Sequence, residues 1–78
     1  MSVMIEVHYK KPEDKEREQA IMSYVSKYDG EVTYREDDNA ESVCLTIEFS
    51  NWKSAEDASS KLRESGEHVE GPMDYGDD

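Results

Sequence analysis

The chain has 78 residues, of which 20 are Asp or Glu and 9 are Lys or Arg, so its formal net charge is −11. This length allows one domain, expected to span residues 1–78, and leaves little room for a large catalytic cleft. The acidic surplus disfavours direct binding to nucleic acid or to anionic membranes. No apolar run is long enough to cross a bilayer and no secretory signal is recognisable, so a cytoplasmic location is expected.

The first predicted element is a strand over residues 3–9, because apolar and polar residues alternate strictly there. A helix follows. Pro12 suits its first position, and Gly30 can supply the left-handed residue that ends it. The inward side of the strand is expected to carry Val3, Ile5, Val7 and Tyr9, and that of the helix Ala20, Ile21, Tyr24, Val25 and Tyr28.

Two further strands are predicted in the middle of the chain. The weaker runs over about residues 31–37, with Val32 and Tyr34 inward. The stronger covers residues 43–49 and repeats the alternation of the first strand. Its inward residues are Val43, Leu45, Ile47 and Phe49.

A shorter second helix is expected to end at Gly66. Its N-cap is either Asn51 or Ser54, and Ser54 with Asp57 approximates a capping box. The last strand, about residues 67–75, contains Gly71-Pro72, and proline cannot donate to a strand ladder, so this strand should lie at an edge. Residues 74–78 are expected to form a mobile acidic tail. The inward residues of the second helix are expected to be Trp52, Ala55, Ala58 and Leu62.

The resulting order, β-α-β-β-α-β, resembles the ferredoxin-like fold of the α+β class. Right-handed crossovers then give a four-stranded antiparallel sheet in the order 4-1-3-2, with both helices on one face. In this arrangement the two strongest strands are central, and the strand with proline lies at an edge, as its residues require.

One stretch, 45–58 (LTIEFSNWKSAEDA), resembles the third strand and second helix of RNA-recognition-motif domains. In that family, aromatic side chains on the open face of the central strands stack on RNA bases. The corresponding positions here hold Met4, Cys44 and Thr46, none of which is aromatic. Together with the net charge, this makes RNA binding through the open face unexpected.

The alternation predicts which side chains the uncovered sheet face presents. Strand topology should bring His8, Arg35, Cys44 and His68 together at one end of this face, with Lys10 and Lys11 in the adjoining loop. The face is expected to carry Met4, Glu6 and His8 from the first strand, Glu31, Thr33 and Arg35 from the second, Cys44, Thr46 and Glu48 from the third, and His68 and Glu70 from the last.

Three interpretations of this face remain open. It is a solvated surface with cross-strand ion pairs, an association surface, or a metal or catalytic site that uses His8, Cys44 and His68. The single cysteine excludes an internal disulfide and any zinc site built on paired cysteines. The possible interaction face comprises Met4, Glu6, His8, Arg35, Cys44, Thr46, Glu48 and His68.

These observations favour a non-catalytic protein-interaction module without a cofactor, metal or catalytic residues. Its expected partner is another protein or a second copy, with self-association through the open sheet as the first candidate. One alternative is an acidic mimic of nucleic acid that occupies the binding site of a nucleic-acid-binding protein. The other is a small metal- or ligand-binding protein.

Overall fold

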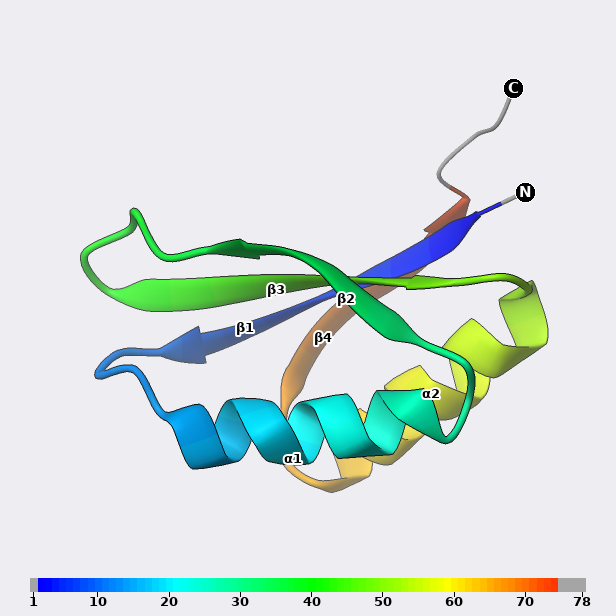
Figure 1. Ribbon diagram of the computed structural model, residues 1–78, viewed down its shortest axis with the longest axis horizontal. Helices are drawn as coiled ribbons and strands as arrows, with labels where there is room; N and C mark the ends of the chain where they lie inside the picture. Colours follow the sequence, from blue (N-terminus) through cyan, green and yellow to red (C-terminus); the bar gives the residue numbers. More distant parts are fainter. Residues whose placement is uncertain (1, 75–78) are drawn as a thin grey trace.

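The computed structural model describes residues 2–74, with the element order expected from the sequence (Figure 1). The sheet order is β2-β3-β1-β4, which is 4-1-3-2 read from the other edge, and every neighbouring pair is antiparallel. Both helices cover the same face (Figure 1). The ferredoxin-like α+β topology is therefore confirmed. The elements are β1 (Val3–Lys10), α1 (Lys15–Ser26), β2 (Glu31–Glu36), β3 (Ser42–Phe49), α2 (Trp52–Glu64) and β4 (His68–Asp74).

The two central strands supply most of the hydrophobic core. They pair along their whole length, from Val3 opposite Phe49 to Lys10 opposite Ser42. Because paired residues share a side of the sheet, the apolar sets of both strands point together toward the helices. The alternation predicted from the sequence is confirmed at all eight positions, which are buried: Val3, Ile5, Val7, Tyr9, Val43, Leu45, Ile47 and Phe49.

The helices complete the core with fewer residues than expected. Ile21 and Val25 of α1 are buried. Ala20 is exposed, because it lies about 100° around the helix from Ile21 and about 140° from Val25. The prediction that Trp52 faces inward is also wrong. It is 40% exposed and its indole N–H donates to Glu56 Oε2 at 2.8 Å, so the ring lies along the outside of α2. The buried residues of α2 are Ala55, Ala58, Ser59 and Leu62.

Both helices begin at a residue whose side chain accepts a backbone hydrogen bond. Asp14 Oδ1 accepts from the Arg17 N–H at 3.0 Å, so α1 begins at Lys15 and Pro12 lies before it, contrary to expectation. Asn51 Oδ1 accepts from the Ser54 N–H at 2.8 Å, which decides between the two expected caps of α2. A carboxylate or amide oxygen here pairs one of the free N–H groups of the first turn.

The residues that follow the helices differ in their roles. After α2, Gly66 has a φ of +96°, as expected of a glycine that ends a helix. After α1 the left-handed residue is Asp29, with φ +65°, and not Gly30. Gly30 is instead needed for space, because a Cβ there would lie 2.5 Å from Cε2 of Phe49.

The last strand is an edge strand, as the proline predicted. β4 pairs only with β1 among the described strands, and the pairing shifts between Met4 and Glu6. The strand extends to Asp74. Residues 75–78, which make up the rest of the expected strand end and tail, lie outside the described residues.

Candidate functional site

The sheet face turned away from the helices is the candidate site, and we call it the open face. Strand pairing shows which residues lie on this face, since directly paired residues point to the same side of the sheet. Figure 1 shows that neither helix crosses this face. Its residues are Met4, Glu6, His8 and Lys10 from β1, Glu31, Tyr34 and Glu36 from β2, Ser42, Cys44, Thr46 and Glu48 from β3, and His68, Glu70 and Met73 from β4.

Arg35 does not belong to the open face, which corrects the sequence-based expectation. The pairing of β2 with β3 is irregular between Val32 and Tyr34, so Arg35 lies opposite Leu45, a core residue. An extra residue in one strand moves every later side chain to the opposite side of the sheet. The same shift places Thr33 at the irregularity, where its hydroxyl donates to Glu48 Oε2 at 3.4 Å.

Glu36 occupies the place beside Cys44 that Arg35 was expected to hold, and Tyr34 also lies on the open face. It pairs with Thr46 and is 61% exposed, whereas the sequence pattern had placed it in the core. Val32 was the only aliphatic residue in this strand, so the alternation had one anchor and could not reveal the shift. The open face therefore has an aromatic residue, on an edge strand rather than on the central strands.

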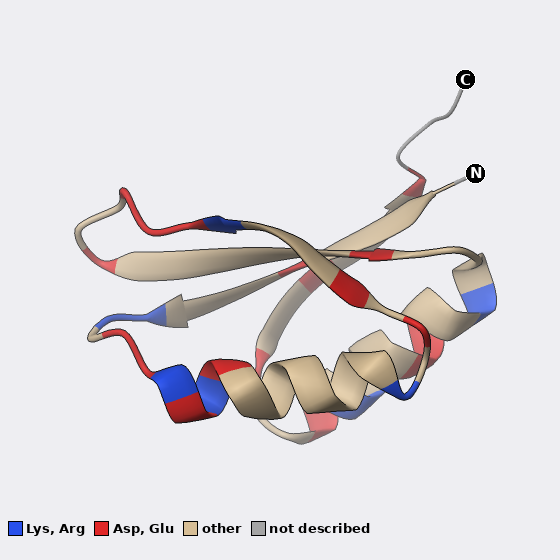
Figure 2. Cartoon of the chain, in the orientation of Figure 1, with Lys and Arg blue, Asp and Glu red and all other residues tan. Residues whose placement is uncertain are grey.

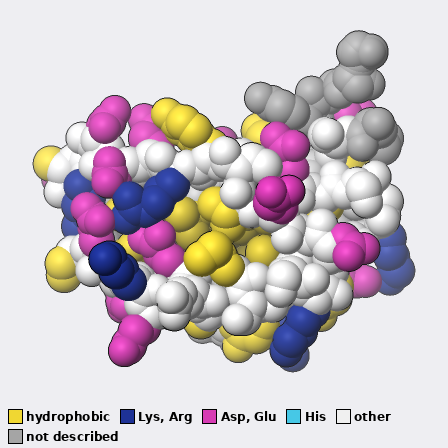
Figure 3. Space-filling model, viewed as in Figure 1, with side chains coloured by type: hydrophobic (Ala, Val, Ile, Leu, Met, Phe, Trp, Pro, Cys, Tyr) yellow, Lys and Arg dark blue, Asp and Glu magenta, His cyan; other side chains and the backbone are white. Residues whose placement is uncertain are grey.

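The guanidinium of Arg35 instead joins β2 to α1 and to the loop after β2. Its nitrogens lie 2.9 Å from Glu13 Oε1, 2.9 Å from Glu18 Oε1 and 2.8 Å from Asp37 Oδ2. The Tyr9 hydroxyl donates to Glu18 from the core side. Figure 3 shows basic and acidic side chains intermixed where α1 meets β2. These ion pairs link the first turn of α1 to the edge strand β2.

We expect Glu18 to give the folded state a measurable dependence on pH. Its side chain is 13% exposed, and its pKa is lowered, chiefly by the hydrogen bonds from Arg35. A carboxyl group with a lowered pKa stabilises the folded chain above its unfolded pKa, and this contribution is lost as the pH falls through the folded pKa. The loss should begin near the ordinary glutamate pKa of about 4.3 and continue below it.

Urea unfolding at a series of pH values checks this expectation. Replacing Glu18 by glutamine should make the decline in unfolding free energy below about pH 4.3 shallower than in the wild type. Glu16→Gln is the matched control, because Glu16 is an exposed carboxylate on the same helix. Equal pH slopes for the two variants would contradict the assigned role of Glu18.

The structure brings His8, Cys44 and His68 together on the open face. Nε2 of His8 lies 3.9 Å from Sγ of Cys44, and the His8 and His68 rings meet edge to face with centroids 5.8 Å apart. Two carboxylates border the same nitrogen: Glu6 Oε1 at 3.4 Å and Glu70 Oε1 at 3.8 Å. Glu70 also reaches His68, whose Nε2 lies 3.5 Å from its Oε2.

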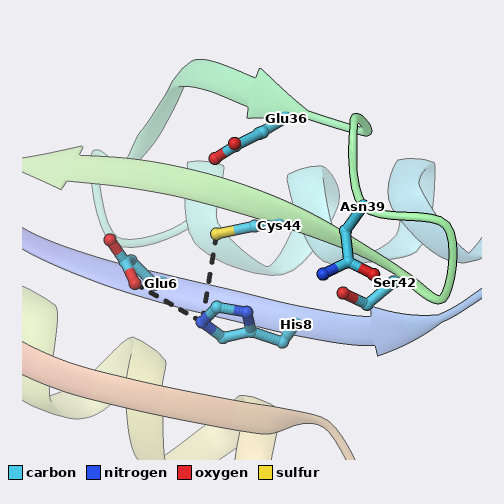
Figure 4. Close-up of a pocket in the computed structure, with 6 residues that line it drawn as sticks. All are labelled: Glu6, His8, Glu36, Asn39, Ser42 and Cys44. Atoms are coloured by element: carbon cyan, nitrogen blue, oxygen red, sulfur yellow. Dashed lines mark hydrogen bonds and ion pairs between the residues drawn. The ribbon is translucent and has the colours of Figure 1, made fainter.

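A shallow hollow of about 220 Å³ lies beside this cluster. In Figure 4 the side chains of Glu6 and Cys44 point toward the His8 ring. Glu36 lies on β2, which is separated from the His8 strand by β3. Burial raises the pKa of the Cys44 thiol, and nearby carboxylates raise it further. A neutral thiol is a weak nucleophile. The hollow is lined by Glu6, His8, Glu36, Asn39, Ser42 and Cys44.

The open face is acidic, and cationic side chains do not cluster on it as the sequence had suggested. Among its described residues Lys10 is the one Lys or Arg. Lys11, in the loop after β1, donates to the backbone oxygen of Asp37 at 2.7 Å. Figure 2 shows acidic residues on all four strands and in the loop after β2. The open-face carboxylates are Glu6, Glu31, Glu36, Glu48 and Glu70.

Comparison with known proteins adds no relative to this description. No protein-family model matches the chain, and searches of curated proteins and of solved structures gave no significant match. Of the helices in residues 2–74, neither is long and apolar enough to span a membrane. The ferredoxin-like topology by itself implies no activity, so function has to be argued from the open face.

Proposed function

We propose that this protein is a non-catalytic binding module whose open face takes up a basic segment of a partner protein. The observation that carries the proposal is an uncovered sheet face on which carboxylates surround exposed apolar side chains. Tyr34 is 61% exposed, Met73 is also exposed, and the half-buried Met4 on the central strand β1 is paired directly with Met73. Aromatic residues and methionines are enriched in the centres of protein interfaces.

Charge complementarity selects the kind of partner. Glu31 and Glu48 lie directly opposite each other on β2 and β3, and Glu6 and Glu70 do the same on β1 and β4. Like charges at directly opposed positions destabilise a sheet, so each pair favours a cation placed between its carboxylates. A segment with lysines or arginines and interspersed apolar residues supplies such cations and also covers the methionines and Tyr34. Complementary charges of this kind accelerate association and select partners.

The same charges disfavour a second copy as the occupant. A twofold dimer through the open face would place the same acidic surface on both sides of the interface. Lys10 alone offers a compensating charge among the described residues of this face. The protein should therefore sediment as a monomer. A dimer that Thr46→Glu dissociates would instead support self-association through the open face.

The proposal predicts which acidic residues carry binding. A random linear-peptide library selected on the wild-type protein should yield peptides enriched in Lys and Arg with apolar residues between them. Reversing the charges of the opposed pair, in a Glu31→Lys/Glu48→Lys variant, should lower the affinity for these peptides by about tenfold or more at about 0.1 M salt. Fluorescence anisotropy with a selected peptide measures the affinity.

A matched variant separates the open face from overall charge. Glu16→Lys/Glu64→Lys changes the net charge equally, but both residues are exposed on the helices. It should retain binding within about threefold, because both helices lie on the opposite side of the sheet from a bound peptide, and salt screens charges over about 10 Å at 0.1 M. Equal losses in the two variants would point to overall acidity, as in a nucleic-acid mimic. A selection without basic enrichment would also overturn the proposal.

A further inference from the structure

Three chemically different ligand atoms converge on the open face. The nearest donor atoms of Glu6, His8 and Cys44 all lie within 4.8 Å of one another. Within this group, Nε2 of His8 is 3.4 Å from Glu6 Oε1 and 3.9 Å from Cys44 Sγ. Figure 4 shows the thiol on β3 and the carboxylate on β1 approaching the same edge of the imidazole ring.

Two of the three separations are close to the edges of a tetrahedral metal site, and the third, between the Glu6 oxygen and the Cys44 sulfur, lies within 4.8 Å. Zn²⁺ binds imidazole nitrogen and carboxylate oxygen at about 2.0–2.2 Å and thiolate sulfur at about 2.3 Å. Tetrahedral angles then place nitrogen and oxygen about 3.4 Å apart, and nitrogen and sulfur about 3.6 Å apart. The observed 3.4 Å agrees with the first value, and the observed 3.9 Å is longer than the second by roughly 0.3 Å.

The surrounding charge also favours a divalent cation at this point. Glu70 Oε1 lies 3.8 Å from the same His8 nitrogen, and Glu36 lines the adjoining hollow. When such a cation binds, it forms a bond to the Cys44 sulfur, and the thiol proton passes to solvent.

The backbone beneath the cluster is suited to hold ligands in place. His8 and Cys44 are directly paired on the two central strands, and Glu6 precedes His8 by two residues on the same side of β1. Ligands on strands at the centre of a sheet are positioned more rigidly than ligands on loops. The hollow beside them opens to solvent and leaves room for a water molecule as a fourth ligand.

We propose that Glu6, His8 and Cys44 form a binding site for a divalent transition metal. Among such metals without redox chemistry, Zn²⁺ is the preferred ion. The mixed sulfur, nitrogen and oxygen donor set favours such an ion over Mg²⁺ or Ca²⁺, which bind oxygen. His68 is not a ligand, although the sequence suggested it. It is 68% exposed and contacts the site only through Glu70 and the His8 ring.

The test uses Co²⁺ as a spectroscopic probe and Zn²⁺ as a competitor on the purified full chain. Co²⁺ should produce a thiolate-to-cobalt absorption band in the near ultraviolet, together with the intense visible bands of a tetrahedral site. Zn²⁺ should abolish both at one equivalent and raise the melting temperature, because it binds the folded state. The site does not depend on the proposed peptide partner, so either proposal can fail alone.

Variants decide which side chains bind the metal. Cys44→Ser should remove the ultraviolet band. Cys44→Ser and Glu6→Gln should each lower the affinity for Zn²⁺ by about tenfold or more. His68→Gln is the control and should change the affinity by less than about threefold. Amide spectra of each variant verify that it folds. Absence of the thiolate band in the wild type, or Zn²⁺ affinity unchanged by Cys44→Ser, would overturn the proposal by showing only diffuse binding to surface carboxylates.

Discussion

Replacing Ile47 by alanine is expected to lower the free energy of unfolding by about 2–5 kcal/mol. Ile47 is fully buried at the centre of β3, opposite Ile5 of β1 and Val32 of β2. Removing three carbon atoms there takes apolar contacts from the core and leaves a cavity between the sheet and the helices. Urea unfolding followed by circular dichroism measures the change.

The adjacent residue provides a matched control. Thr46 precedes Ile47 in the same strand, but its side chain lies on the open face and is half-buried. Thr46→Ala should therefore cost no more than about 1 kcal/mol, within the range of strand propensity. Similar losses at the two positions would contradict the division of β3 into a core side and an open side.

Replacing Gly30 by alanine should cost about 1–3 kcal/mol, because the added methyl group has no room. Its Cβ would lie 2.5 Å from Cε2 and 2.8 Å from Cζ of Phe49, and 3.0 Å from Cβ of Val25. Both neighbours are buried core residues, so they cannot swing into solvent to make space. Thermal and urea unfolding of the purified variant measure the loss.

A second substitution distinguishes this steric cause from a backbone effect. In a Phe49→Leu background the ring edge is absent, so Gly30→Ala should cost less than in the wild type. Residues in contact show coupling energies of about 0.5–3 kcal/mol in such a cycle. If Gly30→Ala costs the same in both backgrounds, contact with Phe49 does not explain why glycine stands there.

The central strands and the fold could be predicted because the alternation of apolar residues is compatible with only one orientation of each central strand. In residues 3–9 and 43–49 every second residue is apolar, and a shift of one residue would expose the whole set. This fixed alternation also located Met4, Glu6, His8, Cys44, Thr46 and Glu48 correctly on the uncovered face. The proximity of His8 to Cys44 followed from the antiparallel register of the two strands.

The edge of the sheet could not be predicted in the same way. β2 has a single aliphatic anchor, Val32, so nothing in its pattern indicates the irregularity that exchanges Arg35 for Tyr34 on the open face. The irregularity also brings Glu36 onto the face, so a guanidinium is lost and a carboxylate is gained. Glu6 as a close neighbour of the His8–Cys44 pair was also missed, since side-chain rotamers rather than strand register bring its carboxylate within 3.4 Å of the imidazole.

The most direct test of the open face as the binding surface is a titration of ¹⁵N-labelled protein with a selected basic peptide, followed by amide chemical shifts. We expect the largest shifts at open-face positions of β1, β2 and β3, including Glu6, Tyr34 and Thr46, with little change along the outer sides of α1 and α2. Shifts concentrated on the helices, with the open-face amides unmoved, would contradict the proposed function.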